Sequence, residues 1–202
     1  MTSAIAVSPE NKKIPESKRF TLEQYLAREE RSKHKHEFYN GEIKIMPGGT
    51  ANHSFISINF TTALKIAIKN SKKKFFIGGS DLGIYLPTLD FVFYADALVV
   101  FEKVEYKAGT KNLIVNPILI VEVASISTRN FDRADKFEAY KTLPSFKEYI
   151  LVEQKKPQIE SRFIHNPNNW ETTIETDLTK NITLRSLGVE IAVADVYENI
   201  EF

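Results

Sequence analysis

Two acidic residues stand inside runs of apolar residues that otherwise have the character of buried strands. Glu122 lies in the run "ILIVEV", and Asp96 lies in the longer run "FVFYADALVVF", which extends from Phe91 to Phe101. An ionised carboxylate inside a sheet costs several kcal/mol unless it is paired or binds a metal. The two acids are therefore candidates for chemistry rather than for packing.

Side chains alternate across a strand, so Ile118, Ile120 and Glu122 are expected to share one face of their strand. If the strand that carries Asp96 is its neighbour, facing Cβ atoms lie about 5 Å apart. Two carboxylates at that separation suit one hard cation, Mg²⁺ or Mn²⁺. Without a cation they would repel each other, and one would take up a proton.

Lys136 is the candidate for a third chemical group. It follows Asp132 by four residues in a predicted helix over residues 132–143, which Pro144 ends. Its long stem would carry the ammonium to the two acids, and two acids with a lysine suit metal-assisted phosphodiester hydrolysis. The simpler alternatives are a surface lysine paired with Asp132, and acids at strand ends that reach solvent or a nearby lysine.

Three further residues are candidates of second rank. Glu37, in a predicted hairpin strand, would bind a metal-bound water, and Asp81 would lie near the site; both types of residue are more often solvated strand-edge or turn carboxylates. His53 would donate to a phosphate, although a residue at a helix start is the simpler interpretation.

The elements that must position these residues follow from periodicity, capping and turn signals. "TLEQ" is a capping box that begins a helix at Thr21, and Asn40-Gly41 suits the tight turn of a hairpin. The predicted helices span about residues 21–31, 53–69 and 132–143. The predicted strands span about residues 36–39, 42–46, 74–77, 82–86, 91–101, 118–123, 148–153, 158–165, 170–176 and 182–185.

The composition limits the domain organisation. The chain has 202 residues, 43% of them hydrophobic, which is enough for one sizeable core. Residues 1–19 are polar and without periodicity, so we predict a flexible N-terminal tail followed by a single domain over residues 20–202. The order of many strands and few helices predicts an α/β or α+β sheet domain.

Charge and cysteine content exclude several classes of site. The net charge is +1, so nucleic-acid binding would have to rest on a local basic patch. The chain has no cysteine, which excludes thiolate metal sites and leaves a hard metal bound by oxygen. No apolar stretch of about 18 residues occurs, so we expect neither a membrane span nor export, and a cytoplasmic location.

Several blocks of the sequence resemble the Uma family of bacterial restriction-endonuclease-like proteins, a branch of the PD-(D/E)xK nuclease superfamily. The blocks that carry the resemblance are "TLEQYL", "HEFYNGEIKIM", "ANHSFI", "FYADALVVF", "PILIVEVASIST", "DRADKFEAY" and "FKEYILVE". They cover the chain from about Phe20 to Glu153.

The resemblance implies a restriction-endonuclease-like core, a mixed β-sheet flanked by helices, with Mg²⁺ or Mn²⁺ and DNA as expected partners. It assigns the first acid of the superfamily to Asp96, the second to Glu122, and the lysine to Lys136, on the helix after the strand. This chain has Ala95 where the family has proline, and Ala124 where the strand lysine usually stands. Superfamily members that cut both strands commonly act as homodimers, so a homodimer is expected.

Three hypotheses follow from these observations. The first is a metal-dependent endonuclease in which Asp96, Glu122 and a main-chain carbonyl such as that of Val123 hold the ion. The second is a catalytically idle nucleic-acid-binding or assembly module of the same fold, which the near-neutral net charge favours. The third, action on a small phosphorylated substrate, has no phosphate-loop motif in its support.

Overall fold

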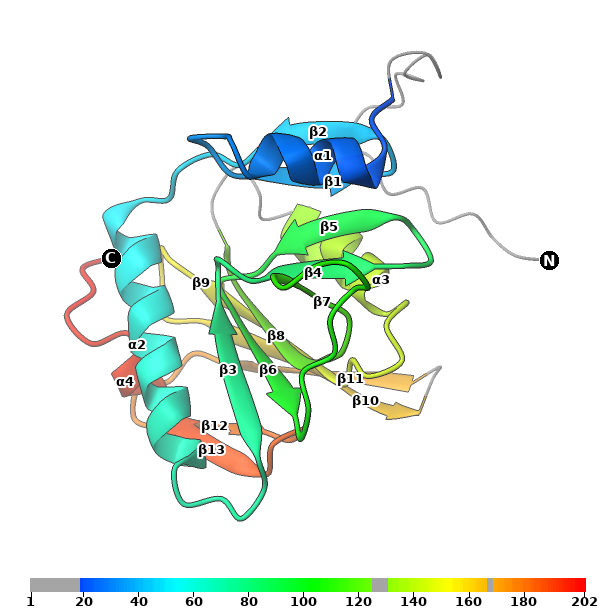
Figure 1. Cartoon of the computed structure of the whole chain (residues 1–202). Coiled ribbons are helices and arrows are strands. Elements are labelled where there is room, and N and C mark those ends of the chain that lie inside the picture. Colours follow the sequence, from blue (N-terminus) through cyan, green and yellow to red (C-terminus); the bar gives the residue numbers. More distant parts are fainter. Residues whose placement is uncertain (1–18, 125–130, 167–168) are drawn as a thin grey trace.

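The computed structural model describes residues 19–124, 131–166 and 169–202, and its chain forms two main β-sheets with helices around them (Figure 1). The predicted tail, up to residue 18, lies outside the described residues, as do residues 125–130 and 167–168. The mixed α+β architecture expected from the sequence is confirmed. Within the described ranges, no helix has the length and apolar character needed to cross a membrane.

The six-stranded sheet is the larger of the two and has the strand order β11-β10-β9-β8-β6-β3. Its strands, in chain order, are β3 (Phe75–Gly79), β6 (Ala97–Phe101), β8 (Pro117–Ala124), β9 (Glu148–Glu153), β10 (Ile159–Asn166) and β11 (Asn169–Glu175). β8 runs parallel to β9 and antiparallel to β6, and all of its residues are buried.

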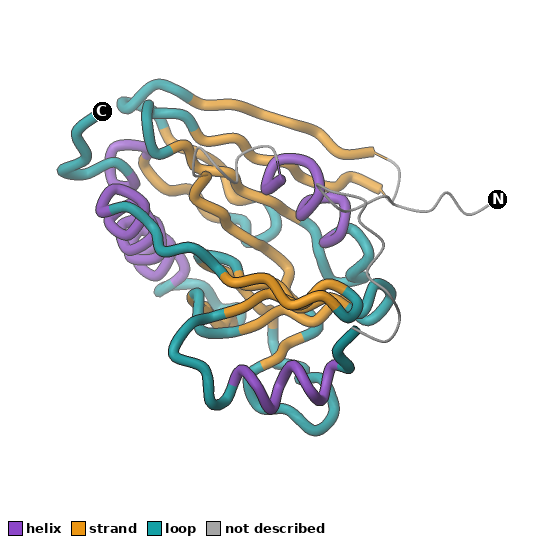
Figure 2. The backbone as a smooth tube through the Cα atoms, turned by 90° about the horizontal axis from the view of Figure 1, so that it is seen from above, coloured by secondary structure: helices purple, strands orange, loops and turns teal. Residues whose placement is uncertain are grey.

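The second sheet has five strands in the order β2-β1-β5-β4-β7. They are β1 (His36–Tyr39), β2 (Glu42–Ile45), β4 (Gly83–Leu86), β5 (Phe91–Tyr94) and β7 (Leu113–Ile114). The remaining elements are α1 (Leu22–Glu29), α2 (Ala51–Ile68), a π-helical turn η2 (Phe131–Lys136), α3 (Phe137–Tyr140), β12 (Asn181–Leu184), β13 (Val189–Ala192) and α4 (Val193–Val196). Figure 2 shows the long helix α2 at one side of the strands, and α4 packs beside it.

β8 separates two cores, as its alternating pattern predicts. Leu119, Val121 and Val123 belong to the core that α2 covers, whereas Ile120 and Ala124 belong to the core under η2 and α3. Ile118 was expected on the face of Ile120 but packs in the α2 core, next to a register irregularity between β6 and β8. Glu122 therefore lies between Ile120 and Ala124 and faces η2 and α3.

The predicted single strand over residues 91–101 is wrong. The chain leaves β5 after Tyr94 and enters β6 at Ala97, so that Ala95 and Asp96 belong to neither strand. β5 pairs with β1 and β4, whereas β6 pairs with β3 and β8. Because the two halves of this apolar run are buried in different sheets, Asp96 lies at the crossing point between the sheets and not in the middle of a strand.

Local sequence signals were reliable at the N-terminal elements. The capping box at Thr21 and Gln24 is present, and Asn40 and Gly41 have φ of 44° and 97° in the hairpin turn. α2 begins two residues before the predicted start, because Thr50 is its N-cap and accepts a hydrogen bond from the His53 amide.

The C-terminal expectations need two corrections. The predicted edge strand near residue 182 is β12, which pairs with β13 in a separate two-stranded sheet rather than extending the main sheet. The predicted helix over residues 132–143 is η2 followed by the single turn of α3. Both Asp132 and Lys136 are buried in this π-helical turn. The apolar pattern of the neighbouring residues does not predict the burial of these two charged side chains.

Glu148 is a fully buried carboxylate that joins the C-terminal segment to β9. It accepts hydrogen bonds from Ser161 Oγ (3.2 Å), the Arg185 amide (3.0 Å), the Ser186 amide (2.9 Å) and Ser186 Oγ (2.7 Å). Burial raises its pKa, and the hydrogen bonds from Ser186, Arg185 and Ser161 oppose that shift.

Replacement of Glu148 by alanine is expected to lower the free energy of unfolding by about 3 kcal/mol, because it leaves several donors without their charged acceptor. Urea denaturation measures the effect. The matched control is Glu190→Ala, which removes an exposed strand carboxylate with two hydrogen bonds of 3.3 Å and should stay within about 0.5 kcal/mol of wild type. Equal losses in the two variants would contradict the role assigned to Glu148.

Candidate active site

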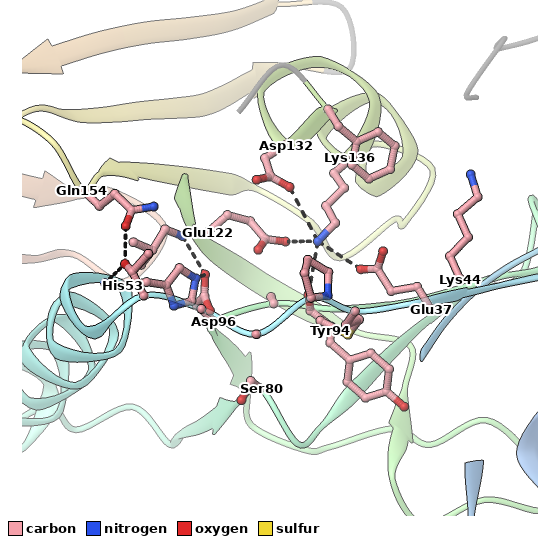
Figure 3. A pocket seen from close by; sticks show the side chains of 18 of the residues that line it. Glu37, Lys44, His53, Ser80, Tyr94, Asp96, Glu122, Asp132, Lys136 and Gln154 are labelled. Atoms are coloured by element: carbon pink, nitrogen blue, oxygen red, sulfur yellow. Dashed lines mark hydrogen bonds and ion pairs between the residues drawn. The ribbon is translucent and has the colours of Figure 1, made fainter. Parts of the chain in front are cut away.

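A pocket of about 600 Å³ opens where the two main sheets meet. Asp96, Glu122 and Lys136 all line it, together with Glu37 and His53 (Figure 3). The sheet crossing supplies Asp96, the end of β8 supplies Glu122, and η2 supplies Lys136. The residues singled out by type and spacing, apart from Asp81, thus lie around one cavity.

Asp96 is held by two contacts to the same carboxylate oxygen. The Val123 amide donates to Asp96 Oδ2 at 2.7 Å, and His53 Nε2 lies 3.2 Å from that atom. Its side chain is 14% exposed, so the carboxylate is accessible from the pocket. Oδ1 receives no hydrogen bond or ion pair from the described residues.

Glu122 is buried at the back of the pocket, where two donors reach one of its oxygens. Lys136 Nζ and Tyr140 OH each lie 3.1 Å from Glu122 Oε1. Burial raises the pKa of this carboxyl well above its ordinary value; Lys136 lowers it, and the neighbouring acids raise it further. Oε2 receives no contact from the described residues.

Lys136 is a buried ammonium among three acids, as Figure 3 shows. Its Nζ lies 3.1 Å from Glu122 Oε1, 3.1 Å from Glu37 Oε1 and 3.7 Å from Asp132 Oδ1, and it donates to the Tyr94 carbonyl at 3.3 Å. Burial alone would lower the pKa of Lys136, but the carboxylates of Glu122 and Glu37 outweigh it and hold that pKa well above the usual value. Lys136 is therefore charged, and it is not the surface lysine of the simpler interpretation.

Glu37 enters the pocket from the other sheet. It stands in β1, and its Oε1 forms an ion pair with Lys136 that lacks hydrogen-bond geometry, while Tyr39 OH donates to Oε2. Burial and the Glu37 charge both raise the pKa of the Tyr39 phenol. Tyr39 therefore stays protonated and can donate this hydrogen bond. Glu37 thus restrains the lysine from the side opposite Glu122.

His53 approaches Asp96 from the first turn of α2. The hydrogen bond to Asp96 raises the pKa of the imidazole, and burial opposes that shift. Asp81, in contrast, is not a pocket residue: its side chain is fully exposed and pairs with Lys35 at 2.7 Å, which lowers the pKa of Asp81. Its neighbour Ser80 does line the pocket.

Two residues of the site were not among the candidates from the sequence. Tyr140 stands in α3, and its hydroxyl donates to Glu122. Gln154 links two elements, because its Oε1 accepts from Thr50 Oγ1 and its Nε2 donates to the Ala124 carbonyl. The feature that could have identified Gln154 is its position directly after β9, beside the end of β8 that carries Glu122.

The donor set suits an ion that keeps part of its water shell. Each of Asp96 and Glu122 has one oxygen engaged by the protein and one oxygen free of contacts from the described residues. Mg²⁺ is commonly bound by one or two carboxylates and several waters, so two such oxygens fit it. In the part of the chain that the structure describes, no three Asp, Glu or His side chains are grouped as a complete metal site.

Comparison with known proteins identifies a family and two relatives of similar sequence. The sequence profile of the Uma2 family, described as "Putative restriction endonuclease", matches residues 22–194. An uncharacterized protein of Synechocystis is 33% identical over 141 residues, which cover 70% of this chain and 78% of the relative. A second uncharacterized Synechocystis protein is 31% identical over 180 residues, covering 89% of this chain and 92% of that protein.

A solved structure shares the fold at low sequence identity. The crystal structure of a protein from Anabaena variabilis, described as a "putative nuclease belonging to DUF820", superposes with a TM-score of 0.68 at 14% identity. The match covers 88% of this chain and 97% of the other. The arrangement of sheets and helices around the pocket is thus found in a second protein of very different sequence.

Proposed function

The chain belongs to the Uma2 family, described as "Putative restriction endonuclease", and from that premise we propose that the protein is a divalent-metal-dependent endonuclease that hydrolyses phosphodiester bonds of DNA. The observation that carries the proposal is that Asp96 and Glu122 lie in one pocket with the buried ammonium of Lys136, each with one carboxylate oxygen that no described residue contacts. Packing alone does not account for Asp96 and Glu122 lining one pocket together with a buried lysine.

Asp96 and Glu122 would hold the ion, with a main-chain carbonyl such as that of Val123 as a further ligand. Mg²⁺ or Mn²⁺, when bound, supplies a water of lowered pKa and polarises a phosphoryl oxygen. Lys136 supplies a fixed positive charge where negative charge develops on the phosphoryl group. Glu37 and Asp132 hold the Lys136 ammonium in place, so no rearrangement is needed at the moment of reaction.

The rim of the pocket suits the backbone of a nucleic acid. Lys44 and Lys155 line it, and their ammonium groups would neutralise phosphates next to the bond that is cut. A local patch of this kind is what a chain of net charge +1 requires. One pocket handles one strand, so we expect a homodimer to act on duplex DNA, and light scattering of the purified protein measures the number of copies.

The test is incubation of the purified full chain with single-stranded, duplex and branched DNA in Mg²⁺, in Mn²⁺ and in chelator. We expect cleavage of at least one DNA form that requires the metal and is absent in Asp96→Asn. No cleavage of any form would refute the nuclease proposal. Salt-dependent DNA binding without turnover would support the idle module of the same fold instead.

A further inference from the structure

Asp96 depends on side-chain and amide contacts from other elements for its orientation. It lies between β5 and β6, so neither sheet holds its main chain in a strand ladder. The described residues that contact its carboxylate are Val123, through the amide at 2.7 Å, and His53, through Nε2 at 3.2 Å. Both contacts are made to Oδ2, so the other oxygen, Oδ1, is left facing the pocket.

His53 is itself fixed by a chain of hydrogen bonds that ends in β8. Its amide donates to Thr50 Oγ1 at 3.1 Å, and Thr50 Oγ1 donates to Gln154 Oε1 at 2.6 Å. Gln154 Nε2 donates to the Ala124 carbonyl at 2.9 Å, two residues beyond Glu122. The start of α2 is thereby tied to the end of the strand that carries the second acid.

The loop before α2 is shaped around the imidazole. A Cβ atom at Gly49 would lie 2.9 Å from His53 Nδ1, closer than side chains normally approach. At Gly48 the same addition would meet nothing within 4 Å. Glycine at position 49 therefore permits His53 to stand where it reaches Asp96, whereas position 48 imposes no such demand.

We propose that His53 is a positioning residue for Asp96: its Nε2–H donates to Oδ2 and, with the Val123 amide, presents Oδ1 to the divalent ion. This inference rests on the proposed function. Hydrogen bonds to ligating carboxylates orient them, and their loss typically costs about 10–100-fold in metal affinity. The imidazole has Nε2 engaged by Asp96 and Nδ1 against Gly49, so it is arranged to hold the acid and not to reach a phosphate.

The experiment is Mn²⁺ titration by calorimetry on the full chain. His53→Leu removes the donor and should weaken Mn²⁺ binding by about 10–100-fold. His53→Gln restores an N–H near the position of Nε2 and should stay within about 3-fold of wild type, a change of under 1 kcal/mol. The matched control is His34→Leu, at an exposed histidine outside the pocket, which should bind as wild type does.

A second pair of variants moves the imidazole without replacing it. Gly49→Ala should displace the ring and weaken Mn²⁺ binding, while Gly48→Ala should leave the affinity unchanged. Thermal unfolding of each variant checks that the fold is retained. In a cleavage assay, saturating Mn²⁺ should restore the rate of His53→Leu, because a positioning residue acts through metal occupancy.

The outcomes separate the two proposals. If wild type binds no Mn²⁺ in the presence or absence of DNA, the proposed metal-dependent function falls and the role of His53 falls with it. If wild type binds Mn²⁺ and Asp96→Asn does not, the metal site stands, and equal affinities of His53→Leu and wild type would overturn the positioning role alone. A rate defect in His53→Leu that saturating Mn²⁺ fails to restore would also overturn it, in favour of direct contact with the substrate.

Discussion

Replacement of Lys136 by methionine is expected to lower the free energy of unfolding by about 3–5 kcal/mol near neutral pH. Methionine has nearly the same length and fills the same space, so the change removes the charge and little else. Glu37, Glu122 and Asp132 would then face one another without the ammonium that lies within 3.1–3.7 Å of each of them. Removing one partner of a buried ion pair leaves an uncompensated charge, which costs more than the pair itself contributes.

Urea denaturation measures this loss, and Lys141→Met is the matched control. Lys141 stands one turn further along the same helical segment and pairs with Glu138 at the surface, so its replacement should cost less than about 1 kcal/mol. Adding Glu122→Gln to Lys136→Met should recover part of the loss, because one of the three acids is neutralised. Equal stability of Lys136→Met and the control would show that the acids do not need the ammonium.

The second large effect is expected on activity and not on stability. Asp96→Asn and Glu122→Gln should each reduce DNA cleavage by about 10³-fold, or about 4 kcal/mol of transition-state stabilisation, because a neutral amide is a poor ligand for Mg²⁺. The double variant should be no slower than either single variant by more than a few-fold, since residues that hold one ion act as a unit.

The stability of Glu122→Gln separates a functional acid from a structural one. The amide oxygen still accepts from Lys136 and Tyr140, and Lys136 keeps the carboxylates of Glu37 and Asp132. We therefore expect the free energy of unfolding to stay within about 1 kcal/mol of wild type, or to rise, because a neutral amide costs less to bury than a carboxylate. A loss of stability as large as that of Lys136→Met would identify Glu122 as a structural partner of the lysine.

Position 124 shows how the lysine of this site is supplied. The strand residue two after Glu122 is Ala124, which is buried and whose carbonyl accepts from Gln154. A lysine at that position would have to fit the core under η2 and α3. Lys136 reaches Glu122 from η2 instead, so the positive charge beside Glu122 is supplied by the helical turn and not by β8.

Much of the local structure follows from short-range physics that is visible in the chain. The capping box at Thr21, the turn at Asn40-Gly41 and the apolar run of β8 depend on neighbouring residues, and each was predicted close to its observed position. The run from Phe91 to Phe101 was misjudged because both halves are buried in the same way, although in different sheets. Hydrophobic periodicity reports burial but carries no information on which strands become neighbours.

The sequence by itself determined which groups are available: two acids in apolar surroundings, a lysine four residues after an acid, no cysteine, and the blocks that mark the family. Only the tertiary structure decided their geometry. It brought Glu37 from the second sheet to Lys136, put His53 against Asp96, and left Asp81 exposed beside Lys35. These contacts join residues up to 99 positions apart (Glu37 to Lys136), and pairing over such distances depends on the packing of whole sheets, which no local pattern specifies.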